Sequence, residues 1–259
     1  MELSAKDKVK KVFGKNADAY VKSSNHAMGD DLPLLVEWLQ PEKSWTILDI
    51  ATGGGHVARM LAPFVKTAVA TDLTEQMLSN TALYLSGIFD NILFAVADAE
   101  ELPFLANTFD AVTCRIASHH FPNPGKFISE VARVLKPGGK FVLIDSIAPE
   151  DPELAAFINE IEKLRDDSYV RCLSKAEWRH HLLGNRLVEK DSADRRQTYD
   201  YEGWVARTAE NEEQIGRVTH HLLFTNERTA TYFGITADGG KIQHFTQDEW
   251  MVMCEKQTE

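Results

Sequence analysis

Cysteine is scarce in this sequence of 259 residues, which has only Cys114, Cys172 and Cys254. They are far apart, odd in number and form no C-x-x-C pair, so their spacing argues against a disulfide framework and against a zinc site. No His or Asn pattern accompanies them, as a cysteine nucleophile would require. We therefore expect a folded enzyme or binding protein that uses neither a cysteine nor a metal in its chemistry.

Long hydrophobic runs and clusters of basic residues are also missing. No stretch approaches the length of a membrane span, and the N-terminus MELSAKDKVKKVFG lacks the apolar core of a signal peptide. The net charge is −11, from 39 acidic and 28 basic residues. Nucleic acids and anionic membranes bind basic surfaces, so neither is an expected partner. The sequence predicts a cytoplasmic protein, monomeric or homodimeric.

Short apolar runs alternate with helix-like segments through the first two-thirds of the chain, a pattern typical of βαβ units around a parallel sheet. The predicted strands are 45–50, 66–72, 92–96, 109–115 and 140–144. The predicted helices between them are 56–61, 74–86 and 127–135. We expect Thr74 to cap the second of these helices, and Lys136-Pro-Gly-Gly139 to form the turn that closes the third.

From Pro149 onward the pattern is less regular. Helical spacing occurs at 152–167, 174–183 and 203–224, and strands are predicted at 187–198 and 244–255. We expect these strands to complete a seven-stranded, mostly parallel sheet with helices on both faces, an α/β doubly wound fold. The remaining helices should form a cap over the substrate side, because open α/β sheets bind ligands at the carboxyl ends of their strands.

A glycine-rich turn gives the strongest local signal. In LDIATGGGH, at 48–56, a predicted strand passes through three glycines into a helix, so the backbone can approach a ligand and free N–H groups can face it. Asp72 ends the second strand, where a carboxylate can bind a ribose diol. Both features indicate an adenosine-containing ligand. A dinucleotide stays open, since Gly53, Gly55 and Ala58 also fit G-x-G-x-x-[GA].

Five motifs occur in order between residues 47 and 144: LDIATGGG, ATDLTEQML, ADAEELPF, FDAVTCRIASHHF and EVARVLKPGGKFVLID. In this order the chain resembles the class I S-adenosylmethionine (SAM)-dependent methyltransferases, especially the ubiquinone and menaquinone biosynthesis branch (methyltransferase type 11). The resemblance implies a Rossmann-like fold, SAM as cofactor, and methyl transfer to a small molecule that it does not identify. It also implies one domain, with an N-terminal helical lid at 1–39, a core at 40–148, and a cap with the final strands at 149–259.

The resemblance further implies which residues bind the cofactor. The loop would lie along the methionine part of SAM, Asp72 would hold the ribose, and Asp98 would accept from the adenine amine. Tyr20 would reach the SAM carboxylate from the lid, and Ala51 departs from the family, which often has glycine there. The full predicted set is Tyr20, Asp49, Ala51, Gly53, Gly55, Asp72, Leu73, Met77, Asp98, Ala99 and Arg115.

Two adjacent histidines, His119 and His120, follow the fourth predicted strand at the edge where the methyl group would point. A hydroxyl or enolisable carbon must lose a proton to be methylated, and a histidine can take it, whereas a free amine or thiolate hardly needs a base. We predict that one of the two acts as a base or orients the substrate, with His26 as a further candidate. The three His-His doublets lack metal-ligand spacing, so no metal is predicted.

Two alternatives remain on the sequence. An NAD-type oxidoreductase would use the same glycine loop, but Asp98-Ala99 and the turn at 135–139 follow the methyltransferase order, and no Tyr-x-x-x-Lys pair is present. A SAM-binding regulator would keep the nucleotide pocket and lack the reaction.

Overall fold

The fold is an α/β sandwich in a computed structural model that describes residues 3–21 and 29–258. The strands are β1 (Thr46–Ile50), β2 (Thr67–Asp72), β3 (Ile92–Val96), β4 (Phe109–Arg115), β5 (Leu135–Ser146), β6 (Leu187–Asp200), β7 (Thr236–Asp238) and β8 (Lys241–Lys256). The first helices are α1 (Ala5–Val21), α3 (Asp31–Leu39), α4 (His56–Leu61), α5 (Glu75–Leu85) and α6 (Pro124–Val134). The later helices are α7 (Pro152–Arg165), α8 (Lys175–Gly184), α9 (Tyr201–Val205), α10 (Glu212–Leu223) and α11 (Glu227–Tyr232).

The strands form one sheet in the order β3-β2-β1-β4-β5-β8-β6, and β7 pairs with β8. Strands β1 to β5 are parallel, while β8 is antiparallel to both β5 and β6. This confirms the predicted doubly wound, mostly parallel sheet. The strand order reverses between β1 and β4, and ligands of open α/β sheets bind at such a switch point. The additional strand β7 is short and wholly exposed, so it has no apolar pattern that would predict it.

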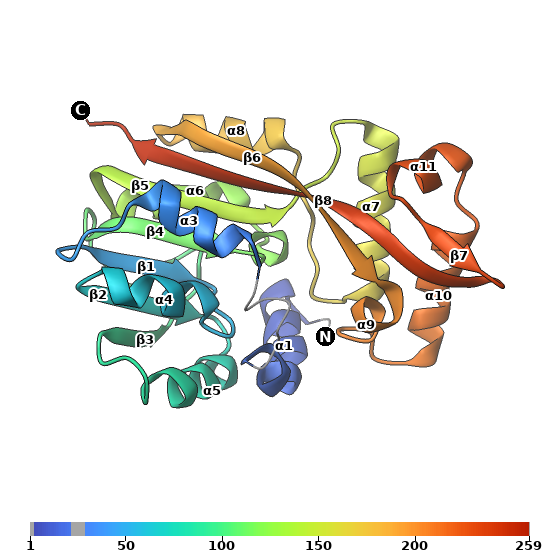
Figure 1. Ribbon diagram of the computed structural model, residues 1–259, viewed down its shortest axis with the longest axis horizontal. Helices are drawn as coiled ribbons and strands as arrows, with labels where there is room; N and C mark the ends of the chain where they lie inside the picture. The colour runs from blue at the N-terminus through green and yellow to red at the C-terminus, as the bar shows by residue number, and fades with distance from the viewer. Residues whose placement is uncertain (1–2, 22–28, 259) are drawn as a thin grey trace.

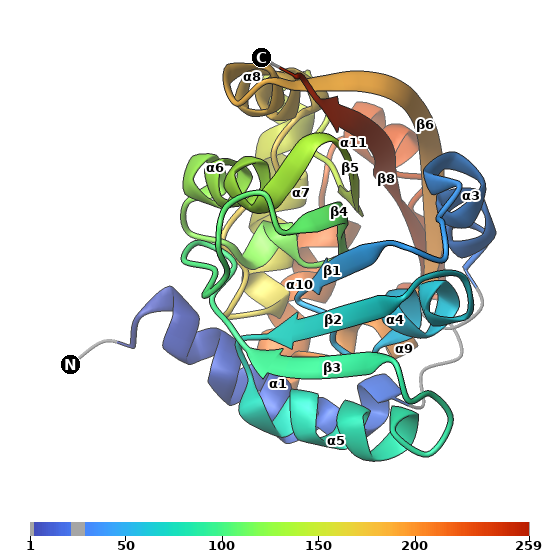
Figure 2. The same cartoon turned by 90° about the vertical axis from the view of Figure 1, so that its left-hand side faces the viewer.

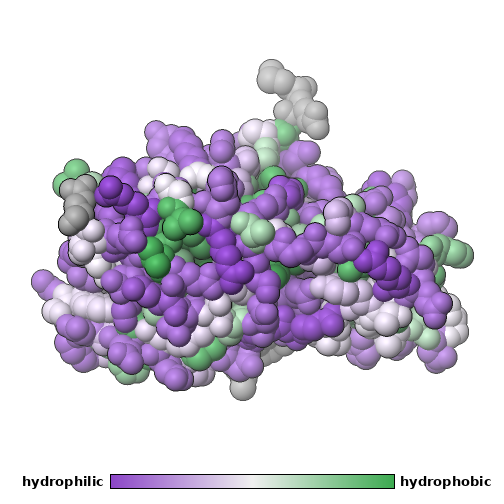
Figure 3. All heavy atoms as spheres, turned by 90° about the horizontal axis from the view of Figure 1, so that it is seen from above, coloured by the Kyte–Doolittle hydropathy of each residue, from purple (hydrophilic) through white to green (hydrophobic). Residues whose placement is uncertain are grey.

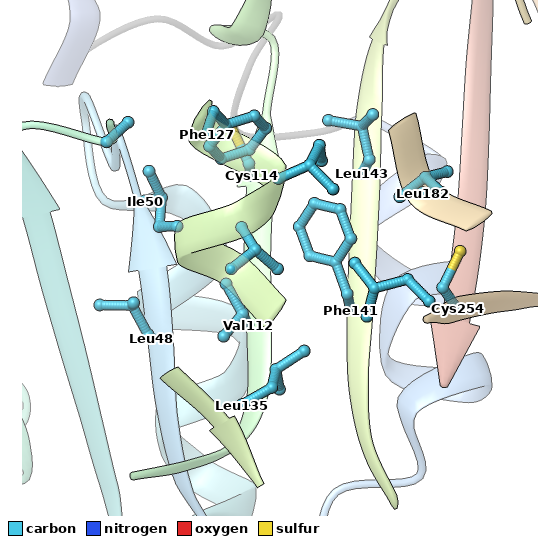
Figure 4. Close-up of a cluster of buried hydrophobic side chains, with 14 of the residues drawn as sticks. Leu48, Ile50, Val112, Cys114, Phe127, Leu135, Phe141, Leu143, Leu182 and Cys254 are labelled. Atoms are coloured by element: carbon cyan, nitrogen blue, oxygen red, sulfur yellow. The ribbon is translucent and has the colours of Figure 1, made fainter. Parts of the chain in front are cut away.

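Both faces of the sheet are covered, which the buried side chains of β1 make clear. Ile47 packs in the cluster with α3 and α4, whereas Leu48 and Ile50 pack in the cluster with α6 and α8. Figure 4 shows the second cluster, where Phe127 of α6 and Phe141 of β5 lie over the strands. Such alternation is expected because successive side chains of a strand point to opposite faces. The sheet is therefore held rigidly from both sides.

The cap is built on the long strands β6 and β8, which extend beyond the rest of the sheet (Figure 1). Helices α7, α9, α10 and α11 gather around these extensions, and a separate core there includes Trp204, Val218 and Phe245. The predicted helix at 203–224 is wrong as one element, because α9 ends at Val205 and α10 begins at Glu212. The side chain of Asn211 accepts a hydrogen bond from the backbone of Gln214 and so starts a new helix.

Two further local predictions need correction. The predicted turn at 136–139 lies inside β5, where the pairing with β4 shifts register between Phe109 and Ala111 and Gly138 has φ +74°. Thr74 is the N-cap of α5, but its side chain makes no capping hydrogen bond. The carboxylate of Asp72 accepts from the backbone N–H of Thr74 instead, at 2.8 Å. A carboxylate at the strand end therefore satisfies the free N–H at this helix start.

Helix α1 lies beside α5, below β3, as Figure 2 shows. Its residues Lys6, Val9 and Phe13 lie near the predicted cofactor residues at the carboxyl ends of the strands. Figure 3 shows another face of the molecule, on which hydrophilic residues predominate and hydrophobic ones form small separate patches. In the part of the chain that the structure describes, no helix is both long and apolar enough to cross a bilayer.

Candidate active site at the carboxyl ends of the strands

A pocket opens beyond the carboxyl ends of β1, β2 and β4 and is bounded by α1; we call it the first pocket. Among the predicted cofactor residues, those that line it are Asp49, Ala51, Gly53, Asp72, Leu73, Met77, Asp98, Ala99 and Arg115. Gly55 is not part of this lining. Tyr20 lies in α1, but its side chain is outside what the structure describes. Residues far apart in sequence thus meet at one edge of the sheet.

Asp49 anchors the glycine loop from below. Its side chain is almost fully buried, and its carboxylate accepts hydrogen bonds from the hydroxyls of Thr52, at 2.5 Å, and Thr113, at 2.8 Å. Burial raises the pKa of this carboxyl to about 6 in spite of these hydrogen bonds. Asp49 therefore fixes the shape of the loop and places a titratable group at the pocket wall.

The loop backbone is left-handed at three positions. Ala51, Gly53 and Gly55 have φ values of +52°, +52° and +76°. A Cβ on Gly55 would lie 2.6 Å from methyl groups of Leu85 and Thr81, so glycine permits the loop to pack on α5. Ala51 is an L-residue in the same region, which costs about 1 to 2 kcal/mol. The departure from glycine at this position therefore stores strain beside the pocket.

Asp72 joins the loop to the second strand. One carboxylate oxygen accepts from the backbone N–H of Gly53, at 3.1 Å, and the other accepts from that of Thr74, at 2.8 Å. Burial raises the pKa of Asp72. A carboxylate offers about four acceptor sites, so these two bonds leave capacity for a diol in the pocket.

Lys6, which the sequence reasoning missed, closes the pocket from α1. Its ammonium lies 2.6 Å from the carboxylate of Asp98 and 2.8 Å from that of Glu100. The other oxygen of Asp98 accepts from the backbone N–H of Glu100, at 2.9 Å. No local signal could identify Lys6, because 92 residues separate it from Asp98. These ion pairs tie the N-terminal helix to the pocket wall.

Arg115 has a second role that its position in the motif does not reveal. Its guanidinium donates from Nε and Nη2 to the carboxylate of Asp31 at the start of α3. Arg195 of β6 pairs with the same carboxylate, with Nη1 at 3.4 Å. The next residue, Ile116, has φ +52°, a rare conformation for a β-branched residue. The pocket wall at the end of β4 is thus fixed to α3 by the pairing of Arg115 with Asp31, and its backbone is strained at Ile116.

His119 is held by Asp145 at the end of β5. Its Nδ1 lies 2.7 Å from one carboxylate oxygen, while its backbone N–H donates to the other at 3.1 Å. Burial opposes a charge on the imidazole, but the Asp145 carboxylate outweighs it, so the pKa of His119 is raised. The charge on His119 in turn keeps the pKa of the buried Asp145 carboxyl below its usual value.

His120 has the opposite character. Its Nδ1 lies 3.2 Å from the backbone carbonyl oxygen of Ser168 and 3.3 Å from the Ser168 hydroxyl, which donates its own proton to Asp166. Both neighbours therefore accept, so Nδ1 carries the proton and Nε2 the lone pair. Burial lowers the pKa of His120, and the neighbouring charge of His119 lowers it further. Two adjacent imidazoles with divergent pKa values are typical of an acid–base site.

A second pocket of about 300 Å³ lies under the cap and adjoins the first. The residues common to the two linings are Phe13, Arg115, Ile116 and His120. His119 lines only the second pocket, which also includes Tyr169 and Trp204. The predicted pair of histidines therefore lies at or beside the junction of two pockets.

The remaining histidine predictions are not part of this junction. His26 falls outside the described residues. The doublets at 180–181 and 220–221 lie on α8 and α10 and line neither of the two pockets. Across 3–21 and 29–258, no group of three or more His, Cys, Asp or Glu residues is placed to hold a metal ion.

Comparison with known proteins identifies the family of the chain. A family model described as a methyltransferase domain matches residues 48–143. The uncharacterized methyltransferase YcgJ of Bacillus subtilis is 35% identical over 226 residues, 86% of this chain and 89% of YcgJ. A crystal structure of YcgJ has a TM-score of 0.85 at 32% identity and covers 88% of this chain and 98% of its own. The ubiquinone/menaquinone biosynthesis C-methyltransferase UbiE of Brucella abortus is 38% identical over 133 residues, 49% of each protein. Because YcgJ matches most of the chain in both sequence and structure, we conclude that this protein belongs to the class I SAM-dependent methyltransferases.

Proposed function

We propose that the first pocket binds SAM and that the second admits a small-molecule methyl acceptor, with His120 taking a proton from the acceptor. The observation that carries this proposal is the junction of the two pockets at Phe13, Arg115, Ile116 and His120. A methyl donor in one pocket and a nucleophile in the other would meet there. The residues expected from the resemblance supply the rest of the cofactor site.

The first pocket has the chemistry that SAM requires. Asp72 keeps acceptor capacity for the ribose diol, and Leu73 and Met77, which line the same pocket, provide an apolar surface for the adenine. The carboxylate of Asp98 lies where an adenine amine can donate, beside Lys6. When SAM is bound, its sulfonium supplies the methyl group.

The protein's own contribution to the reaction is alignment and proton transfer. An acceptor X–H that forms a bond to the methyl carbon releases its proton, while the C–S bond breaks and sulfur leaves with the electron pair as a neutral thioether. The lone pair on Nε2 of His120 can accept that proton, because the lowered pKa keeps this imidazole neutral near pH 7. His119, fixed by Asp145, positions the adjacent ring, whose centroid lies 4.3 Å away.

The test is transfer of label from [methyl-³H]SAM to a mixture of small metabolites grouped by functional group. The wild-type protein should produce a labelled small molecule and S-adenosylhomocysteine (SAH). His120→Gln should reduce the rate by about 100-fold, since general-base catalysis contributes roughly 10²- to 10⁴-fold, without changing SAH affinity. The exposed His180 gives a control, and His180→Gln should keep full activity.

Two outcomes would contradict the proposal. Label transfer that is unaffected by His120→Gln would remove the proton-accepting role. Protein that binds SAM but labels nothing in any metabolite pool would favour the alternative of a SAM-binding regulator.

A further inference from the structure

Glu249 is a buried carboxylate with an unusual lack of partners. It lies on β8 opposite Ser146, next to the Asp145 position of β5, and it lines the second pocket. It is 8% exposed, and no hydrogen bond reaches its carboxylate from any residue within 3–21 and 29–258. The nearest cation is Nε of Arg195, 3.9 Å away. A buried charge without hydrogen bonds costs stability, so a functional reason for it is required.

Three of the four arginines that line this pocket, Arg115, Arg165 and Arg195, pair with carboxylates of the protein. Arg115 donates to Asp31 through two nitrogens, and Arg195 also pairs with Asp31. Arg165 donates from Nε and Nη2 to Glu162 and stacks on a tryptophan ring. These three guanidinium groups are therefore neutralised by carboxylates. Nη1 of Arg195, 3.4 Å from Asp31, nevertheless has no hydrogen-bond partner among residues 3–21 and 29–258.

Several hydrogen-bond acceptors in the pocket have unused capacity. Asp166 accepts from Ser168 through Oδ1, at 2.8 and 2.5 Å, and among residues 3–21 and 29–258 no donor reaches its Oδ2. His120 presents the lone pair of Nε2, as its tautomer requires. Glu249 adds a complete carboxylate. A pocket rich in free acceptors complements a ligand that carries N–H donors and positive charge.

The surroundings of Glu249 favour a cation as well. Burial raises the pKa of Glu249, and Asp31 raises it further against the lowering effect of Arg195. The ring of Tyr199, stacked on Phe245 with centroids 5.6 Å apart, belongs to the same pocket lining. Aromatic faces attract ammonium groups, and an ammonium would also stabilise the carboxylate charge that burial disfavours.

We propose that the methyl acceptor carries an amino group, and that Glu249 binds this group as an ammonium in the second pocket. The inference rests on the proposed function, because it takes the second pocket as the acceptor site. It narrows the substrate class from small molecules in general to those that carry an amino group. The X–H group that His120 deprotonates is a separate group of the acceptor, because an ammonium has no lone pair with which to attack the methyl carbon.

The test uses three probes that share a phenyl group and a two-carbon arm: 2-phenylethylamine, 2-phenylethanol and 3-phenylpropanoate. Binding of each is measured by calorimetry to SAH-saturated protein. The amine should bind wild type at least about tenfold more tightly than the alcohol or the acid, a difference of about 1.4 kcal/mol. Equal binding of the alcohol, preferential binding of the acid, or no binding of the amine at about 10 mM would each overturn the proposal.

Glu249→Gln is the variant that isolates the carboxylate. It should abolish the preference for the amine while leaving SAH affinity unchanged. Glu255 is the matched control, because it lies on the same strand, also stands 3.9 Å from a cation, and is outside the pocket. Glu255→Gln should keep the amine preference. An amine preference that survives Glu249→Gln would overturn the assignment of this residue.

Thermal unfolding separates a binding role from a structural one. If Glu249 is a ligand-binding group, Glu249→Gln should raise Tm without ligand, because it removes a buried charge that lacks hydrogen bonds. If its pairing with Arg195 stabilises the fold, the variant should lower Tm, which would contradict the proposal. SAH binding is measured first for each protein. If the wild-type protein does not bind SAH, the proposed function is refuted. If it binds SAH but does not prefer the amine, only this inference is refuted.

Discussion

Asp145 holds His119 through both oxygens of its carboxylate, one on the ring Nδ1 at 2.7 Å and one on the backbone N–H at 3.1 Å. The same carboxylate accepts from the hydroxyl of Ser118. One buried side chain at the end of β5 thus fixes both the ring and the backbone of a segment that lies at the junction of the two pockets. The stability of the protein and the pKa of His119 should therefore both depend on Asp145.

Replacement of Asp145 by Asn should lower the free energy of unfolding by about 3 kcal/mol, because it leaves His119 without its buried counter-charge. The raised pKa of His119 means that this stabilisation is complete below its unfolded value and is lost as pH rises through the folded value. The lowered pKa of Asp145 means that it is lost again as pH falls through that carboxyl's folded value. Urea unfolding at several pH values measures the effect.

A control for this measurement is the exposed pair of Lys175 and Asp194, whose atoms lie 2.8 Å apart. Asp194→Asn should change stability by less than about 1 kcal/mol, as is typical of surface pairs. A loss for Asp145→Asn as small as that of the control would contradict the account.

The pKa values of the two imidazoles should be shifted in opposite directions. His119 should titrate above the ordinary value of 6.5, and His120 below it. ¹⁵N-edited NMR can read both values and the tautomer, with resonances assigned from His119→Gln and His120→Gln. We expect the proton of neutral His120 on Nδ1. A His120 that is protonated at pH 7, or that carries its proton on Nε2, could not act as the base.

Gly55→Ala should destabilise the protein and weaken SAH binding. The left-handed φ of +76° costs an alanine about 1 to 2 kcal/mol, and the contact with Leu85 and Thr81 at 2.6 Å adds to that cost. Gly216 in α10 is the matched control, because a Cβ there meets nothing within 4 Å. Gly216→Ala should stabilise the helix by about 0.5 to 1 kcal/mol. Thermal unfolding of both variants measures the two effects, and a shift of the same sign in both would contradict the loop geometry.

SAH affinity should fall as pH decreases through about 6, where Asp49 becomes protonated. The sign follows from the raised pKa: above it the carboxylate is ionised and attracts the ammonium of the methionyl group, and below it that attraction is lost. Calorimetry across this pH range should show a smaller dependence for Asp49→Asn than for wild type. An identical pH profile for the two proteins would show that Asp49 is not responsible.

The sequence predicted those parts of the site that local patterns encode. The strand end at Asp72 predicted a ribose-binding carboxylate, and the resemblance to the methyltransferases implied Asp49 and Asp98. The fold brings all three to one edge of the sheet. Glycine spacing located the loop, although Gly55 serves its packing on α5 rather than the pocket lining. Local motifs were therefore sufficient to predict much of the lining of the first pocket.

Contacts between distant parts of the chain could not be predicted in the same way. Lys6 meets Asp98 across 92 residues, and Asp31 meets Arg115 across 84, so no periodicity connects either pair. Glu249 is buried on β8, and no local pattern marks an acidic residue of a strand as buried. The break between α9 and α10 was also missed, because an Asn can be a cap or an ordinary surface residue until its hydrogen bonds are known.

The most direct test of the central claim is calorimetric binding of SAH and of NADH to wild type, to Asp72→Asn and to the exposed control Asp90→Asn. We predict that SAH binds and NADH does not. Asp72→Asn should weaken SAH by at least about tenfold, since a hydrogen bond to a charged group contributes roughly 1.5 to 3 kcal/mol, and Asp90→Asn should leave it unchanged. Binding of NADH in place of SAH, or equal SAH affinity in all three proteins, would contradict the assignment of the first pocket to SAM.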